Sequence, residues 1–227
     1  MNFLSHYYFD RHATDPNLVL GTILPDLVKN ADKTWHLHPA RYAKQLVNNA
    51  ASTSLLYGWN RHLEIDKHFH SSAFFSNHTA EIRTKISPVL DNSPVRPSFL
   101  AHISLELMLD SLLITGKLVD PDAFYVHLRQ VDHNGLDRFL AINGITERGI
   151  FFRFLQEFIQ AKYLHSYQDP SNIIYALNRI CQRLWIDPLS ETQKLQLTAV
   201  LTDYLDKLGE NFMEIFFRIE TLMKGDK

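Results

Sequence analysis

Cysteine is nearly missing from this 227-residue sequence, which contains only Cys181. A single cysteine excludes an internal disulfide and a cysteine-rich zinc site, and it fits a reducing compartment. Runs of basic residues are also missing, and the formal net charge is -2 at pH 7. The sequence therefore offers no broad positive surface for nucleic acid, and we expect no nucleic-acid partner.

Long hydrophobic runs are missing as well. No stretch approaches the roughly 18 apolar residues that suggest a membrane helix, and the N-terminal residues do not show a basic segment followed by an apolar one. We therefore expect no signal peptide, no membrane association and a cytoplasmic location. Hydrophobic residues at 45% and charged residues at 21% are typical of a soluble globular protein. The length favours a single domain over residues 1–227.

Glycine is scarce, with 8 residues, and no segment shows the two-residue alternation of a β-strand. Helical periodicity dominates, so the sequence predicts an all-α, single-domain bundle of many helices. Asp15-Pro16 and Ser190 to Gln193 have the pattern of helix N-caps, and Gly116 that of a helix end. Turns are expected at residues 134–135 and 143–144. The expected helices cover residues 3–12, 16–30 with a kink at Pro25, 39–69 with a break near Gly58, 72–89, 97–116, a helix from 121, 146–167, 170–185 and 190–223.

What the sequence does have is histidine, with 12 residues. In the stretch from 62 to 70, His62, Asp66 and His70 recur every four positions, so a helix would place them on one face. In the stretch from 102 to 110, His102, Glu106 and Asp110 repeat this spacing among leucines. Charged groups rarely occur on so apolar a helix unless they are paired or hold a metal.

These two helices are predicted to face each other across a divalent metal ion. Positions eight residues apart on a helix are separated by about 12 Å, so adjacent pairs are the realistic ligand units. The third residue of each face would orient a ligand or serve a second ion. His6 and Asp26 interrupt two other apolar helices and could reach the same centre. The mixture of imidazole and carboxylate favours Mn, Fe, Zn or Ni over Ca. The alternatives are hydrogen-bonded histidines and a buried ion pair with arginine.

Four segments of the sequence resemble, in order, segments of the acyl carrier protein phosphodiesterase family, which is distantly related to the HD phosphohydrolases. The segment from Met1 to His6 is similar to MNFLAH, and Gly21 to Leu27 is similar to GNLLADF. His62 to Asp66 resembles HRRID, and Leu105 to Leu113 resembles LDVMWDHFL. A fainter similarity covers Leu177 to Arg183.

The resemblance implies an all-α, HD-like fold and a Mn2+-dependent phosphodiesterase that removes 4′-phosphopantetheine from holo-acyl carrier protein. The residues that match the family in type are His6, Asp26, His62, Asp66 and Asp110, and Glu106 replaces an aspartate. Asp26, His62 and Asp66 are the expected catalytic residues. A metal ion in such a site polarises a phosphoryl oxygen and activates water, and a nearby carboxylate or imidazole acts as general base.

The sequence departs from the family at several positions. Leu63 and Glu64 replace two arginines, His70 replaces an aspartate, and Ser111 replaces a histidine. His102 has no counterpart in the family. A rearranged metal site that includes His70 and His102 is therefore expected.

Three functions remain open at this point. The first is a metal-dependent phosphodiesterase that acts on holo-acyl carrier protein or a smaller phosphoric ester, with Arg179 and Arg183 contacting phosphate. The second is a divergent metal enzyme that hydrolyses phosphomonoesters or nucleotides. The third is a helical protein without catalytic activity, in which the polar side chains form structural pairs and the two arginines form a solvated helix face.

Overall fold

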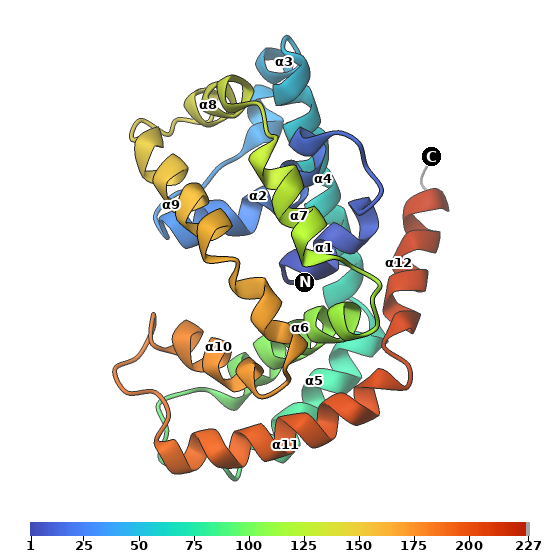
Figure 1. The fold of residues 1–227 in the computed structure, drawn as a ribbon, viewed down its shortest axis with the longest axis vertical. Coiled ribbons are helices and arrows are strands. Elements are labelled where there is room, and N and C mark those ends of the chain that lie inside the picture. The colour runs from blue at the N-terminus through green and yellow to red at the C-terminus, as the bar shows by residue number, and fades with distance from the viewer. Residues whose placement is uncertain (226–227) are drawn as a thin grey trace. The chain divides into compact units, whose positions relative to one another are not determined.

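The computed structural model describes residues 1–225 (Figure 1). Helices account for 74% of the chain, and residues 1–225 contain no β-strand, which confirms the predicted all-α fold. Tertiary contacts group the chain into two compact units, each made of separate stretches of sequence. The α1 unit contains Phe3–Asp66 and Val119–His165, and the α5 unit contains Met1–Asn2, Lys67–Leu118 and the chain from Ser166 onward. The single-domain and HD-like assignments stay predictions.

The α1 unit surrounds α2, which packs against α1, α7 and α9. Its side chains Leu20, Ile23, Leu24 and Leu27 are fully buried. The helices of this unit are α1 (Phe3–Asp10), α2 (Pro16–Ala31), the 3-10 helix η1 (Pro39–Tyr42), α3 (Ala43–Leu46), α4 (Ala50–His70) up to Asp66, α7 (Pro121–Arg129), α8 (His133–Ile142) and α9 (Arg148–Ala161).

Helix α2 begins as the sequence predicts and crosses α4 at two glycines. The Asp15 side chain accepts a hydrogen bond from the Asn17 backbone, and Pro16 occupies the first helical turn. A Cβ atom on Gly21 would lie 2.5 Å from the Leu55 carbonyl oxygen, and one on Gly58 would lie 2.3 Å from a carbonyl oxygen of α2. The two backbones therefore touch because neither crossing residue has a side chain.

Several predicted boundaries are wrong. The helix predicted over residues 146–167 ends at Ala161, because Lys162 adopts a left-handed conformation with φ +46°. The predicted break near Gly58 is absent, because this glycine is the crossing point inside continuous α4, and the chain breaks at residues 47–49 instead. The predicted turn at 134–135 is the first turn of α8, where Asp132 caps the Asn134 and Gly135 amides. The predicted last helix is interrupted at residues 210–212. The expected turn at 143–144 is present, with Gly144 at φ +87°.

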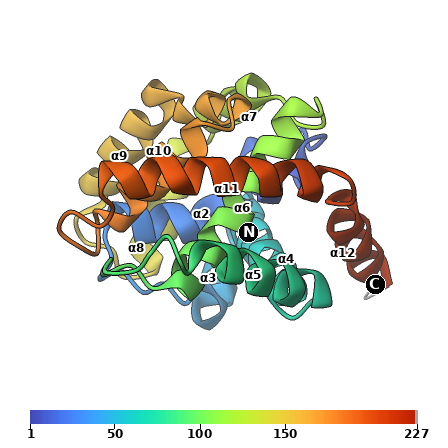
Figure 2. The ribbon, with the colours of Figure 1, turned by 90° about the horizontal axis from the view of Figure 1, so that it is seen from below.

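The α5 unit is built around α6, which packs against α5, α10 and α11. Figure 2 shows α11 running across this unit, and it contacts both α5 and α6. Leu105, Met108, Leu109 and Leu113 of α6 are fully buried. The unit contains the last turn of α4, α5 (Ala73–Ile86), α6 (Pro97–Thr115), α10 (Asn172–Cys181), α11 (Glu191–Gly209) and α12 (Met213–Gly225), and the 3-10 helix η2 (Tyr163–Gln168) includes the boundary at Ser166.

Within residues 1–225, α6 is the one helix long and apolar enough to cross a membrane by length and composition. The sequence predicts no such segment. In the structure, 61% of the apolar window of α6 is buried inside the protein, as in the central helix of a globular core. This burial explains why α6 is apolar on most of its surface.

Candidate metal centres

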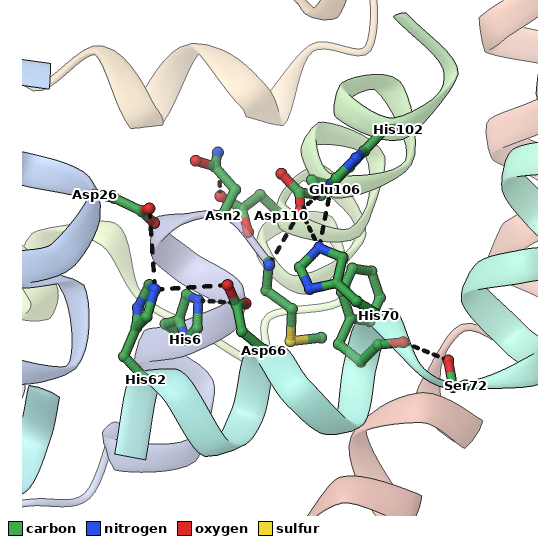
Figure 3. Close-up of polar contacts among 12 residues, drawn as sticks. Asn2, His6, Asp26, His62, Asp66, His70, Ser72, His102, Glu106 and Asp110 are labelled. Atoms are coloured by element: carbon green, nitrogen blue, oxygen red, sulfur yellow. Dashed lines mark hydrogen bonds and ion pairs between the residues drawn. The ribbon is translucent and has the colours of Figure 1, made fainter. Parts of the chain in front are cut away.

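The first cluster of potential ligands lies in the α1 unit and consists of His6, His62 and Asp66, here called the His62 triad (Figure 3). His6 comes from α1, and the other two come from successive turns of α4. His6 Nε2 lies 3.2 Å from Asp66 Oδ1, and His62 Nε2 lies 3.6 Å from Asp66 Oδ2. Both imidazoles are buried, and their rings stack with centroids 4.0 Å apart.

A backbone hydrogen bond determines which nitrogen of His62 is available. His62 Nδ1 lies 2.8 Å from the Thr22 carbonyl oxygen, which can only accept. Nδ1 must therefore carry the proton, and Nε2 of the neutral ring presents a lone pair. That lone pair faces Asp66 Oδ2 at 3.6 Å and Asp26 Oδ1 at 4.0 Å. A lone pair among carboxylate oxygens is stabilised only by a cation or a proton between them.

Protonation of His62 is disfavoured in the fold. Burial, together with the neighbouring His6, lowers the pKa of His62 to about 3. Burial opposes ionisation of Asp66, but neighbouring donor and positive-charge effects, of which the contact with His6 is the largest, lower the pKa of Asp66 below its usual range. At neutral pH the cluster therefore contains a neutral imidazole beside an ionised carboxylate, the protonation states that metal ligands require.

The dimensions of the His62 triad fit a divalent ion. Two ligand atoms bonded to one ion at about 2.0–2.3 Å lie about 3.0–3.6 Å apart. The separations of 3.2 Å from His6 to Asp66 Oδ1 and of 3.6 Å from His62 to Asp66 Oδ2 fall in this range, although they involve different oxygens. One ligand atom from each of the three residues lies within 4.8 Å of the others. The His62 triad can therefore hold a metal ion.

Asp26 lies at the solvent side of the His62 triad. It comes from α2, its side chain is 37% exposed, and it points toward His62 (Figure 3). An oxygen 4.0 Å from His62 Nε2 can become a fourth ligand after a small movement, or remain beside a bound water.

Three residues that the sequence analysis did not single out support His62. The Asp10 carboxylate forms a two-pronged pair with Arg61, in which Asp10 Oδ1 lies 2.8 Å from Nη2 and Oδ2 lies 3.3 Å from Nε. Asp10 also accepts a hydrogen bond of 2.8 Å from the Thr22 hydroxyl. Because the carbonyl of Thr22 accepts from His62, the ion pair holds the residue that orients the imidazole. The spacing of residues in the sequence cannot show that a backbone carbonyl is the hydrogen-bond partner of His62.

The second cluster lies in the α5 unit and consists of His70, His102 and Glu106, here called the His102 triad (Figure 3). His102 Nε2 lies 3.0 Å from Glu106 Oε1, and His70 Nε2 lies 3.4 Å from the same oxygen. The two Nε2 atoms are 3.2 Å apart. These three atoms form a triangle whose edges also suit ligands of a single ion.

Glu106 is ionised in this arrangement. Burial alone would raise the pKa of Glu106, but the Met1 amino group, 3.1 Å from Oε1, and the two imidazoles hold it well below its usual range. The side chain of Glu106 is 16% exposed, whereas those of His70 and His102 are 32% and 41% exposed. The His102 triad is therefore a carboxylate at the base of two solvent-facing imidazoles.

The structure sorts the predicted ligands into two triads, whereas the sequence predicted one centre with a second ion as an alternative. The expected pair of Glu106 with Asp110 does not form, because Glu106 contacts His102 and His70 whereas Asp110 accepts a hydrogen bond of 2.9 Å from Asn2 Nδ2. Asp110 therefore lies outside both triads. His70 belongs to the second triad, and its spacing of eight residues from His62 is too long for both imidazoles to bind one ion.

Two further predictions concern side chains outside the triads. Arg179, in the last turn of α10, and Arg183, beyond its end, are both exposed, and their contact with phosphate stays a prediction. Ser111, which stands where the resemblance has a histidine, is buried and donates to the Tyr167 carbonyl oxygen at 2.7 Å. Ser111 therefore adds no ligand to the His102 triad.

No protein-family model matches the chain, and no curated protein and no solved structure matches it either. The geometry of the two triads is consequently the main basis for a functional proposal.

Proposed function

We propose that the protein is a divalent-metal-dependent hydrolase of phosphoric diesters, with the His62 triad as its metal site. The observation that carries this proposal is the orientation of His62, whose Nδ1 donates to the Thr22 carbonyl while Nε2 faces Asp66 and Asp26. A neutral nitrogen lone pair directed at two carboxylates is a cation site by its chemistry.

In this proposal His6, His62 and Asp66 hold the ion. A bound divalent ion polarises a phosphoryl oxygen and lowers the pKa of water. Asp26 is solvent-accessible and close to His62, so its carboxylate is placed to accept the proton of the attacking water. The water oxygen forms the new bond to phosphorus, the ester oxygen leaves, and this oxygen takes up a proton.

The substrate class rests on the resemblance to acyl carrier protein phosphodiesterases. Leu63 is 52% exposed and, with Glu64, occupies the place of two arginines of that family, so the charge that would meet a phosphate or an acidic carrier protein is missing there. A small phosphoric diester is therefore the proposed substrate, and holo-acyl carrier protein is the second substrate to test. The family's Mn2+ is the first metal to test, and Fe, Zn and Ni follow.

The test compares metal-free and Mn2+-loaded protein with bis(p-nitrophenyl) phosphate and with holo-acyl carrier protein. We expect Mn2+ to restore turnover, and His62→Ala and Asp66→Asn to lower it by more than about 100-fold, because ligand loss exceeds the effect of altering an outer partner. His127→Ala is the matched control in the same unit, since His127 contacts Tyr7 and the Ala13 carbonyl and belongs to neither triad.

Equal turnover in wild type and the two ligand variants would contradict the proposal. Turnover of p-nitrophenyl phosphate or nucleotides without turnover of diesters would assign the site to the divergent phosphohydrolase. Absence of bound metal and of any stability change with metal would leave a structural pair network.

A further inference from the structure

The proposed hydrolytic site does not use the His102 triad, which is assembled in the α5 unit from the last turn of α4 and from α6. We propose that this triad is a second, independent site for a divalent transition-metal ion of the zinc class. It has three protein ligands, namely His70 Nε2, His102 Nε2 and Glu106 Oε1, and it leaves a coordination position open to water or a small anion.

The three donor atoms form a nearly regular triangle, with edges of 3.0, 3.2 and 3.4 Å. An ion with bonds of about 2.0–2.2 Å and tetrahedral angles requires edges of about 3.3–3.6 Å, and octahedral angles require about 3.0 Å. All three edges lie close to these values. One ion above the triangle could therefore contact the three atoms with little movement of the side chains.

Hydrogen bonds alone cannot satisfy all three contacts of this triangle. Each imidazole Nε2 carries at most one proton, and that proton can point toward only one neighbour. His70 Nε2 and His102 Nε2 are both close to Glu106 Oε1 and to each other, so at least one close contact would lack a proton along its axis. A single metal ion would contact all three atoms at once, and at Glu106 Oε1 it would take the place of the Met1 amino group, which lies 3.1 Å from this oxygen.

The surroundings fix the ligands but leave one side open. The His102 and His70 rings each lie 4.9 Å from the Phe75 ring, and His70 also lies 5.0 Å from Phe69. Phe69 and Phe75 form an aromatic wall beside the two imidazoles. Ser72 caps α5 by accepting a hydrogen bond of 3.0 Å from the Phe75 amide, which holds this wall in place. The imidazoles remain 32% and 41% exposed, so water can reach the ion.

The donor types select the class of metal. Two imidazoles and one carboxylate suit Zn2+ and neighbouring first-row ions, whereas Ca2+ and Mg2+ prefer oxygen ligands. Three protein ligands with an accessible further position are the pattern of exchangeable sites rather than closed structural ones. The triad is therefore expected to bind a zinc-class ion, and this ion is expected to bind water, azide or another small anion at its open position.

The test measures zinc retained by metal-free protein after equilibration with excess Zn2+ and a weak chelator, followed by desalting and elemental analysis. Wild type should retain two equivalents, and Glu106→Gln and His102→Ala should each retain one. Glu106→Gln preserves the shape of the side chain, and His102 is partly exposed, so at least one variant is expected to keep wild-type helicity by circular dichroism. His68→Ala, also on α4 but outside both triads, is the matched control and should retain two equivalents.

A second readout examines the open position. In the His62→Ala background, Co2+ at the His102 triad should give visible absorption bands that shift on addition of azide and vanish when Glu106→Gln is added. Equal zinc content in wild type, Glu106→Gln and His102→Ala would overturn the second site. Cobalt absorption bands that do not shift on addition of azide would overturn its open position. Loss of zinc in Glu106→Gln but not in His62→Ala would instead support the second site and contradict the proposed hydrolytic one.

Discussion

The two triads contain nearly the same donors but differ in how they are supported. In the His62 triad the imidazoles are buried, and a backbone carbonyl sets the tautomer of His62. In the His102 triad the imidazoles face solvent, and an almost buried carboxylate lies beneath them. The buried imidazole of His62 is therefore oriented by a hydrogen bond from its second nitrogen. The exposed imidazoles of His70 and His102 are instead oriented by Glu106 and by the rings of Phe69 and Phe75.

The largest expected effect comes from the helix crossing beneath the His62 triad. In Gly58→Ala the added Cβ meets the backbone of α2, which would separate Thr22 from His62. We expect a loss of about 3 kcal/mol in the free energy of unfolding by urea denaturation, with loss of metal from the His62 triad and retention at the His102 triad. Gly149→Ala is the control, since no atom lies within 4 Å of its added Cβ.

Metal removal should have the next largest effect. A ligand present at 100 times its dissociation constant stabilises a protein by about 2.7 kcal/mol per site. Chelation should therefore lower the thermal midpoint of wild type, and the drop should be smaller in His62→Ala and in Glu106→Gln. Identical drops in wild type and both variants would show that the stabilising ion binds elsewhere.

A smaller effect is expected from Thr22→Val, which removes the hydroxyl that donates to Asp10 but keeps the carbonyl that accepts from His62. Loosening this outer partner should weaken metal binding at the His62 triad by up to about tenfold, measured by calorimetric titration. Binding at the His102 triad should not change. Thr115→Val is the matched control, because the Thr115 hydroxyl donates to a carbonyl of its own helix.

The burial of neutral His62 should make the free energy of unfolding of the metal-free protein fall as the pH is lowered. The pKa of His62 is about 3 in the fold, below the usual 6.5, so between these values the unfolded chain binds more protons. The stability that neutral His62 contributes is present above pH 6.5 and is lost progressively as the pH falls toward 3. Between pH 6 and 5 we expect wild type to lose about 1 kcal/mol more than His62→Gln by urea denaturation. Equal pH slopes would indicate that His62 is not buried as a neutral group.

Local spacing was sufficient for part of this structure. The pair of His62 with Asp66 follows from helical geometry, and His6 and Asp26 were noticeable as polar residues in apolar helices. Composition and periodicity predicted the all-α fold, which depends on local preferences along the chain.

Contacts between distant segments could not be predicted from spacing. His102 and Asp110 lie one helical turn before and after Glu106, so spacing alone allows either to pair with it. Only the position of Asn2 shows that Asp110 accepts a hydrogen bond from Asn2 instead. Gly58 alone predicts a helix break, because the sequence does not reveal that the backbone of α2 lies against it. The hydrogen bond from His62 to the Thr22 carbonyl could not be predicted from residue types, since every residue carries a backbone carbonyl.

The most direct measurement is the anomalous diffraction of crystals grown with Zn2+, recorded on both sides of the zinc absorption edge. The central claim predicts a peak within about 2.0–2.3 Å of His6 Nε2, His62 Nε2 and an Asp66 oxygen, with His62 Nδ1 still donating to the Thr22 carbonyl. No peak at this position, with His62 Nε2 within hydrogen-bonding distance of a carboxylate oxygen, would contradict it.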